Sequence, residues 1–395
     1  MSSSSQICKK LQKYYQANVL ENASPEVQNT FKSVVEYVIK TPKGFPNANK
    51  TLFKLIQNYY KKDTKNKIYK IKEISGPYTL TIMRSQKYKK TLVLFGEQHE
   101  MRNPCKNDMY GKPSSMVMLK YLEDVLRETP VFLDIYLEDD WSWKFLWEHS
   151  KMGEATLENL RGGFTHCINR KEKCKWKYVS RIHYTDVRGI IDTKEPSFSD
   201  FFSVLNDLAR NRVTPLVLDW CEKMKDHTEK QFLSYLKKQY IQGNKYIKKE
   251  LERSTETEKI TKWLNATLKQ RINDTWVKNL FKNFIKAHKL NQQSSALTGT
   301  LLMFLLYPAS IMMDGYVLSR VFKKFKQKGE INSPQEPTNI IMYAGAAHTR
   351  HYIDFLRNHM DFKTIHTVKE GLPRMFTSPN CLDMSGVKFP LFEPF

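Results

Sequence analysis

The sequence predicts an α/β fold with a largely parallel central sheet flanked by helices. Two observations lead to this prediction: apolar runs of strand length recur along the chain, and amphipathic helical segments stand between them. Strands that alternate with helices usually lie parallel, because each helix carries the chain back across the sheet. The chain has 395 residues, 41% of them hydrophobic, which is enough to bury a large core.

The first part of the α/β core is expected over residues 61–218. The runs KIYKIKEI and YTLTIMRS flank a Gly-Pro pair at positions 76 and 77, which predicts a β-hairpin. KTLVLFG, VFLDIYLE and RIHYTDV then read as three buried strands. Helices are expected over residues 114–128 and 197–211, since each segment is amphipathic and opens on a serine that can cap it.

The remaining segments are assigned by composition and periodicity. Residues 1–60 predict a helical N-terminal appendage, and residues 219–291 predict a charged helical insert because they show no strand pattern. Residues 292–370 form the second part of the core, with NIIMYAG as a strand followed by a helix, and residues 371–395 form a C-terminal tail. The apolar run over residues 301–307 is too short for a membrane span, so we expect a buried helix bent near Pro308 and no transmembrane segment.

Charge and cysteine content bear on partners and location. The chain carries 64 Lys+Arg against 41 Asp+Glu, a formal net charge of +23, which favours contact with nucleic acid or another polyanion. Solvated helix faces are the more ordinary explanation of dispersed lysines. The six cysteines form no CxxC pair, so we expect reduced thiols and a soluble, cytoplasmic protein. A zinc site at His166, Cys167 and Cys174 has a spacing that matches no standard finger.

Two motifs of the form Gly-x-x-His carry the functional prediction. Gly96-Glu97-Gln98-His99 and Gly345-Ala346-Ala347-His348 each follow an apolar strand, whereas the same spacing at residues 163–166 follows none. Ligands of open α/β sheets bind at the carboxyl ends of strands, so the two motifs predict one shared site.

Polar groups at other strand ends complete the predicted site, and two chemistries are open. Glu97, His99 and His348 can hold a divalent metal such as manganese, cobalt, iron or zinc that activates water. Alternatively, glutamate and histidine act as acid and base without metal, and Arg188 stabilises negative charge. The predicted catalytic residues are Glu97, His99, Glu138, Arg188 and His348, with Gly96, Gly345, Asp186 and Asp314 as structural support.

Together GEQH after a strand, HYTDVRG and NIIMYAGAAH resemble the erythromycin-esterase/ChaN-like superfamily, which includes the TraB/PrgY and Tiki proteins. The resemblance implies an α/β core with one Gly-x-x-His motif in each half, completed by a glutamate and an arginine, which Glu97 and Arg188 match. Its members include metal-free esterases, metal-dependent proteases and a haem-binding group. The charged insert at residues 219–291 departs from the superfamily and can cover, replace or regulate the substrate site.

The resemblance therefore implies a hydrolase whose small-molecule or peptide substrate is unknown. The alternative is a non-catalytic binding protein, virion-associated or otherwise, that uses the same fold and a basic surface to contact nucleic acid. The lysine-rich style of the chain resembles relatives in large DNA viruses, which leaves packaging in a virus particle open as a location.

Overall fold

The computed structural model describes two β-sheets and helices that cover both faces of the larger sheet. The described residues are 71–97, 105, 115–129, 131–140, 156–169, 174, 176, 179–187, 215, 245, 247–271, 310–326, 334–369, 380–388 and 391–392. The predicted appendage at residues 1–60 and the predicted helix at residues 197–211 lie outside this set. Of the predicted charged insert, residues 245 and 247–271 are described.

Along the described part of the chain, four strands come first, and helices and strands then alternate as far as the last two strands. They are β1 (Glu73–Ser75), β2 (Thr79–Ser85), β3 (Lys90–Glu97), β4 (Ser115–Val117), α4 (Met118–Glu128), β5 (Leu133–Asp140), α5 (Thr156–Asn169), β6 (Ser180–Asp186), α10 (Thr257–Arg271), β7 (Asn339–Gly345), α13 (Ala346–His359), β8 (Lys363–Val368) and β9 (Cys381–Asp383). A further helix runs over residues 310–321.

The main sheet is mixed, with six strands in the order β6-β5-β7-β3-β2-β8. Neighbours from β6 to β3 are parallel, but β2 lies antiparallel to both β3 and β8. The prediction of a largely parallel sheet is therefore wrong. The physical reason is the turn at residues 86–89, which is too short for the crossover that a parallel pair requires.

The predicted hairpin across Gly76 and Pro77 is also wrong. β1 belongs to a second sheet of three strands in the order β4-β1-β9, while β2 pairs with β3. Gly76 has a backbone φ of +124°, which residues other than glycine rarely adopt. At this residue the chain turns from one sheet to the other. The Gly-Pro pair does mark a turn, but the strands on its two sides belong to different sheets and do not pair with each other.

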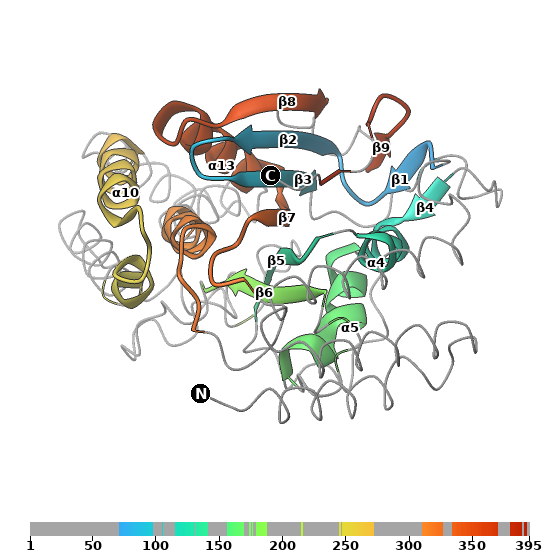
Figure 1. Cartoon of the computed structure of the whole chain (residues 1–395), viewed down its shortest axis with the longest axis horizontal. Coiled ribbons are helices and arrows are strands. Elements are labelled where there is room, and N and C mark those ends of the chain that lie inside the picture. The colour runs from blue at the N-terminus through green and yellow to red at the C-terminus, as the bar shows by residue number, and fades with distance from the viewer. Residues whose placement is uncertain are drawn as a thin grey trace, which may run out of the picture.

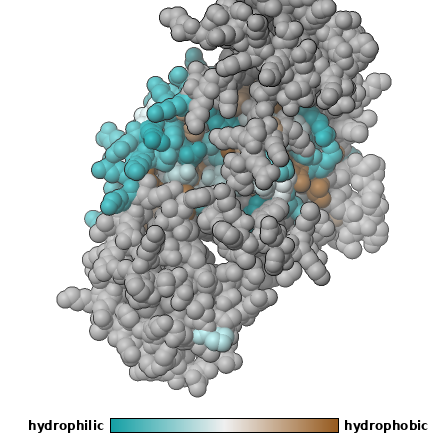
Figure 2. Space-filling view, turned by 90° about the horizontal axis from the view of Figure 1, so that it is seen from below, coloured by the Kyte–Doolittle hydropathy of each residue, from teal (hydrophilic) through white to brown (hydrophobic). Residues whose placement is uncertain are grey.

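The main sheet has a buried core on each face. Helices α4 and α5 cover one face, while α13, α10 and the helix over residues 310–321 cover the other (Figure 1). The two central strands, β3 and β7, are buried along their whole length, which explains their uninterrupted apolar sequences. At one face of the molecule, the described residues in view are mostly hydrophilic and hydrophobic ones form small patches (Figure 2).

Four cysteines are paired in disulfides, so the expectation of reduced thiols is wrong for them. Cys105 is bonded to Cys381 on β9, 276 residues later in the chain, and Cys167 is bonded to Cys174. The bond between Cys167 and Cys174 takes up both sulfur atoms of the zinc site that the sequence suggested at His166, Cys167 and Cys174. Such a distant pairing depends on the small sheet, which sequence spacing does not reveal.

Among the described residues, no helix has the length and apolar character that a membrane crossing requires. The apolar run at residues 301–307 lies outside the described residues.

Candidate functional site

Three neighbouring parallel strands end at the same edge of the main sheet, and each brings a predicted site residue to that edge. Glu97 at the end of β3 is in register with Gly345 at the end of β7, and Leu137 of β5 is in register with Tyr343. Glu138 therefore lies at the level of Ala344, one residue before Gly345. The prediction that strand ends gather these residues rests on this parallel half of the sheet.

A buried histidine lies between two carboxylates at this edge. The Nδ1 atom of His348 is 2.6 Å from an oxygen of Asp314, and its Nε2 atom is 3.3 Å from an oxygen of Glu138. Asp314 is 0%, Glu138 2% and His348 7% exposed, so water screens these contacts little. We call Glu138, Asp314 and His348 the acid–base cluster.

Two further contacts fix the carboxylates of the cluster. The backbone N–H of Gly345 donates to the second oxygen of Glu138 at 2.6 Å. Nδ1 of His351, one helical turn after His348, is 2.7 Å from the second oxygen of Asp314. Residues three apart on a helix share a face, so the His-x-x-His spacing is the signal that could have placed His351 here.

The carboxylates keep His348 protonated. Burial lowers the pKa of His348, but the charges of Glu138 and Asp314 outweigh burial and raise this pKa to about 10. Burial raises the pKa of Asp314, yet its contacts with His348 and His351 hold that pKa below its usual value. At neutral pH, His348 is thus an imidazolium whose two N–H groups face two carboxylates.

Glu97 does not join the acid–base cluster. Its carboxylate accepts a hydrogen bond from the hydroxyl of Tyr343, a residue of the core beneath α4 and α5. Side chains alternate along a strand, so Glu97 faces the same side as Phe95 of that core. Glu138 and His348 lie on the opposite side, where Asp314 and α13 pack.

The other predicted site residues have different positions. His99 and Arg188 lie outside the described residues. Gly345 ends β7, Gly96 is the last residue but one of β3, and Asp186 ends β6 in register with Asp140.

A second buried histidine illustrates the opposite ionisation. Nε2 of His183 is 2.9 Å from Asp134, which also binds Arg181, and Nδ1 of His183 is 2.9 Å from the guanidinium of Arg320. Because Arg320 can only donate, Nδ1 is the acceptor and Nε2 carries the proton. Burial lowers the pKa of His183 to about 3, and this histidine is neutral. Arg320 also pairs with Glu250, so this network joins β5, β6, the helix over residues 310–321 and the segment that carries Glu250.

The two described residues of the predicted metal site, Glu97 and His348, do not meet. Both ring nitrogens of His348 already face carboxylates, and Glu97 lies on the other side of the sheet. Within the part of the chain that is described, the one group with metal-ligand spacing is Glu73, Cys105 and Cys381. Its two sulfurs form a disulfide and offer no thiolate.

We found no match to this chain among protein-family models, curated proteins or solved structures. The acid–base cluster is therefore interpreted from its geometry.

Proposed function

We propose that the chain is a hydrolase in which Glu138 and His348 transfer protons without a metal. The observation that supports this proposal best is the contact of 3.3 Å between a buried carboxylate and a buried imidazolium. Base and acid are thus neighbours at the carboxyl ends of parallel strands, where α/β proteins bind their ligands. Asp314 holds Nδ1 of His348 and leaves Nε2 as the atom that exchanges a proton.

In the proposed reaction Glu138 acts as the base and His348 as the acid. Glu138 takes a proton from a water molecule as the water oxygen bonds to the carbonyl carbon of an ester or amide. The bond from that carbon to the leaving group then breaks, and His348 donates its Nε2 proton to the leaving group. Finally, the proton on Glu138 passes to Nε2 of His348, which restores the carboxylate and the imidazolium.

The electrostatics of the cluster assist the second part of this step. The charge of Glu138 makes the largest contribution that raises the pKa of His348. When Glu138 takes up the proton of water, this charge disappears, and the pKa of His348 falls. The imidazolium therefore becomes a stronger acid at the moment when the leaving group needs a proton.

A substrate screen with matched variants tests the proposal. Wild-type protein is assayed on chromogenic esters, amides and peptides, beside His348→Gln and the control His359→Gln, an exposed histidine on the same helix. We expect His348→Gln to lower the hydrolysis rate at least about 100-fold and the control to leave it unchanged. Equal rates in wild type and His348→Gln, no hydrolysis of any compound, or a rate that EDTA abolishes would each contradict the proposal.

The formal charge of +23 favours a second function, binding of a polyanion. Retention of the protein on immobilised DNA that falls steeply with salt, equally in wild type and His348→Gln, would support it. Retention that does not depend on salt would contradict it.

A further inference from the structure

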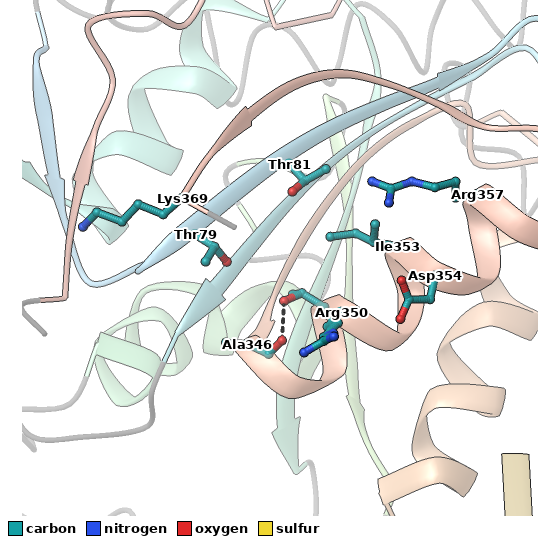
Figure 3. Close-up of a pocket in the computed structure, with 9 residues that line it drawn as sticks. Thr79, Thr81, Ala346, Arg350, Ile353, Asp354, Arg357 and Lys369 are labelled. Carbon is teal, nitrogen blue, oxygen red and sulfur yellow. Dashed lines mark hydrogen bonds between the residues drawn. The ribbon is translucent and has the colours of Figure 1, made fainter. Parts of the chain in front are cut away.

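A cavity of about 330 Å³ lies between α13 and β2, away from the acid–base cluster. Thr79 and Thr81 of β2 face charged side chains of α13 across it (Figure 3). The helix contributes the stripe Arg350, Asp354 and Arg357, whose spacing places all three on one side of α13. A cavity of this size suits a small organic molecule.

Three hydroxyl groups and two guanidinium groups line this cavity. The hydroxyls belong to Thr79, Thr81 and Thr349, and the guanidinium groups to Arg350 and Arg357. Hydroxyls and guanidinium forks together are the usual ligands of a phosphate group in proteins. Arginine matters most, because its planar fork can bind two oxygens at once.

The positively charged side chains that line the cavity differ in how many hydrogen-bond donors they leave for a ligand. Nζ of Lys369 donates to the backbone oxygen of Cys381 at 2.7 Å, so this lysine is fixed at the edge. Arg357 donates through one terminal nitrogen to the hydroxyl of Thr364 at 3.1 Å, which leaves its other donors for a ligand. Arg350 has an exposed side chain on the same stripe, and Asp354 is the one acidic residue among those that line the cavity.

The floor of the cavity is fixed by close packing of the two Gly-x-x-His motifs. A Cβ atom on Gly96 would lie 2.4 Å from the hydroxyl of Thr79, 2.7 Å from that of Thr349 and 3.1 Å from Cα of Ala346. Glycine thus lets the end of β3 approach the start of α13. Thr349 also donates to the backbone oxygen of Ala346 at 3.0 Å, which orients its hydroxyl.

We propose that this cavity binds a small phosphorylated molecule. The guanidinium groups of Arg350 and Arg357 bind the phosphate oxygens, and the threonine hydroxyls complete the contacts. Asp354 accepts hydrogen bonds from hydroxyl groups of the same molecule. The site is separate from the acid–base cluster, because His348 meets Asp314 and Glu138 and is not part of the cavity lining.

The test follows the methyl group of Ile353, which lines the cavity, by NMR on full-length protein labelled at isoleucine methyl groups. An Ile353→Val variant identifies its signal. Inorganic phosphate is added at constant ionic strength, and we expect a saturable shift of this signal. Binding then has a readout that is independent of hydrolysis, so this proposal and the proposed function can fail separately.

Three variants decide whether the cavity, and not general positive charge, binds phosphate. We expect Arg350→Gln with Arg357→Gln to weaken binding at least about tenfold. Thr79→Val with Thr81→Val keeps shape and charge but removes two hydroxyls, and we expect it to weaken binding as well. The control Lys262→Gln with Lys269→Gln removes two exposed charges on α10 and leaves binding unchanged. No saturable shift, or equal loss of binding in the α10 control, would overturn the proposal.

Discussion

Replacement of His348 by glutamine should change how the stability of the protein depends on pH. In the folded protein the pKa of His348 rises from 6.5 to about 10, because Glu138 and Asp314 outweigh the effect of burial. A group whose pKa is higher in the folded state stabilises the protein fully below its unfolded pKa. This stabilisation is lost as the pH rises from about 6.5 through about 10.

The size of the effect follows from the same two pKa values. One pKa unit corresponds to about 1.4 kcal/mol, so protonation of His348 contributes roughly 5 kcal/mol to the free energy of unfolding near pH 6. Between pH 7 and pH 9.5 the folded state keeps this proton and the unfolded state does not. The difference in stability between wild type and His348→Gln should therefore shrink by about 1.4 kcal/mol per pH unit.

Urea unfolding at half-unit steps of pH measures this difference directly. His359→Gln is the matched control: it makes the same replacement at an exposed position of α13, and its difference from wild type should not vary over this range. Asp314→Asn provides a second variant, since it removes one of the two carboxylates and should reduce the pH dependence of the wild type. A constant difference between wild type and His348→Gln from pH 7 to pH 9.5 would mean that His348 is neutral, and would refute the reasoning.

Three further changes test other parts of the structure. The difference in stability between wild type and His183→Gln should shrink by about 2 kcal/mol in urea unfolding as the pH falls from 7 to 5. The reason is that the pKa of His183 in the folded protein, about 3, lies below its unfolded value, so wild type loses stability on acidification and the variant does not. A difference that stays constant would contradict a neutral His183. Gly96→Ala should cost about 2 kcal/mol through its contact of 2.4 Å with a hydroxyl, whereas Gly386→Ala, whose nearest neighbour is at 3.7 Å, should be nearly neutral in the same assay. Joint replacement of Cys105 and Cys381 by serine should lower the unfolding free energy by about 4 kcal/mol under non-reducing conditions, since their bond closes a very long loop; unchanged stability would mean that the bond does not form.

The sequence predicted the parallel half of the sheet better than its antiparallel half. The runs that became β3 and β7 are mostly apolar because both faces of these central strands are buried. The pairing of β2 was missed, since strand patterns reveal which residues are extended but not which strands become neighbours. The turn at residues 86–89 is lysine-rich and lacks the Asn-Gly or Asp-Gly pair that marks tight hairpins.

The candidate site was predicted in part for a similar reason. Glu138 and Gly345 lie near the ends of β5 and β7, His348 follows β7, and parallel pairing brings them together. The side of the sheet that Glu97 faces depends on the register of β3, which no motif records. Asp314 contacts two histidines from a separate helix, and only the tertiary packing of that helix on α13 creates this contact.

The most direct test of the proposed acid–base cluster compares the two glutamates that the sequence predicted to be catalytic, Glu138 and Glu97. Glu138→Gln and Glu97→Gln are assayed on the best substrate from the hydrolase screen, with circular dichroism to confirm folding. Because Glu138 contacts His348 and Glu97 contacts Tyr343 on the other side of the sheet, we predict a loss of at least about 100-fold for Glu138→Gln and a change of less than about threefold for Glu97→Gln. The reverse result, with Glu97 essential and Glu138 dispensable, would contradict the account.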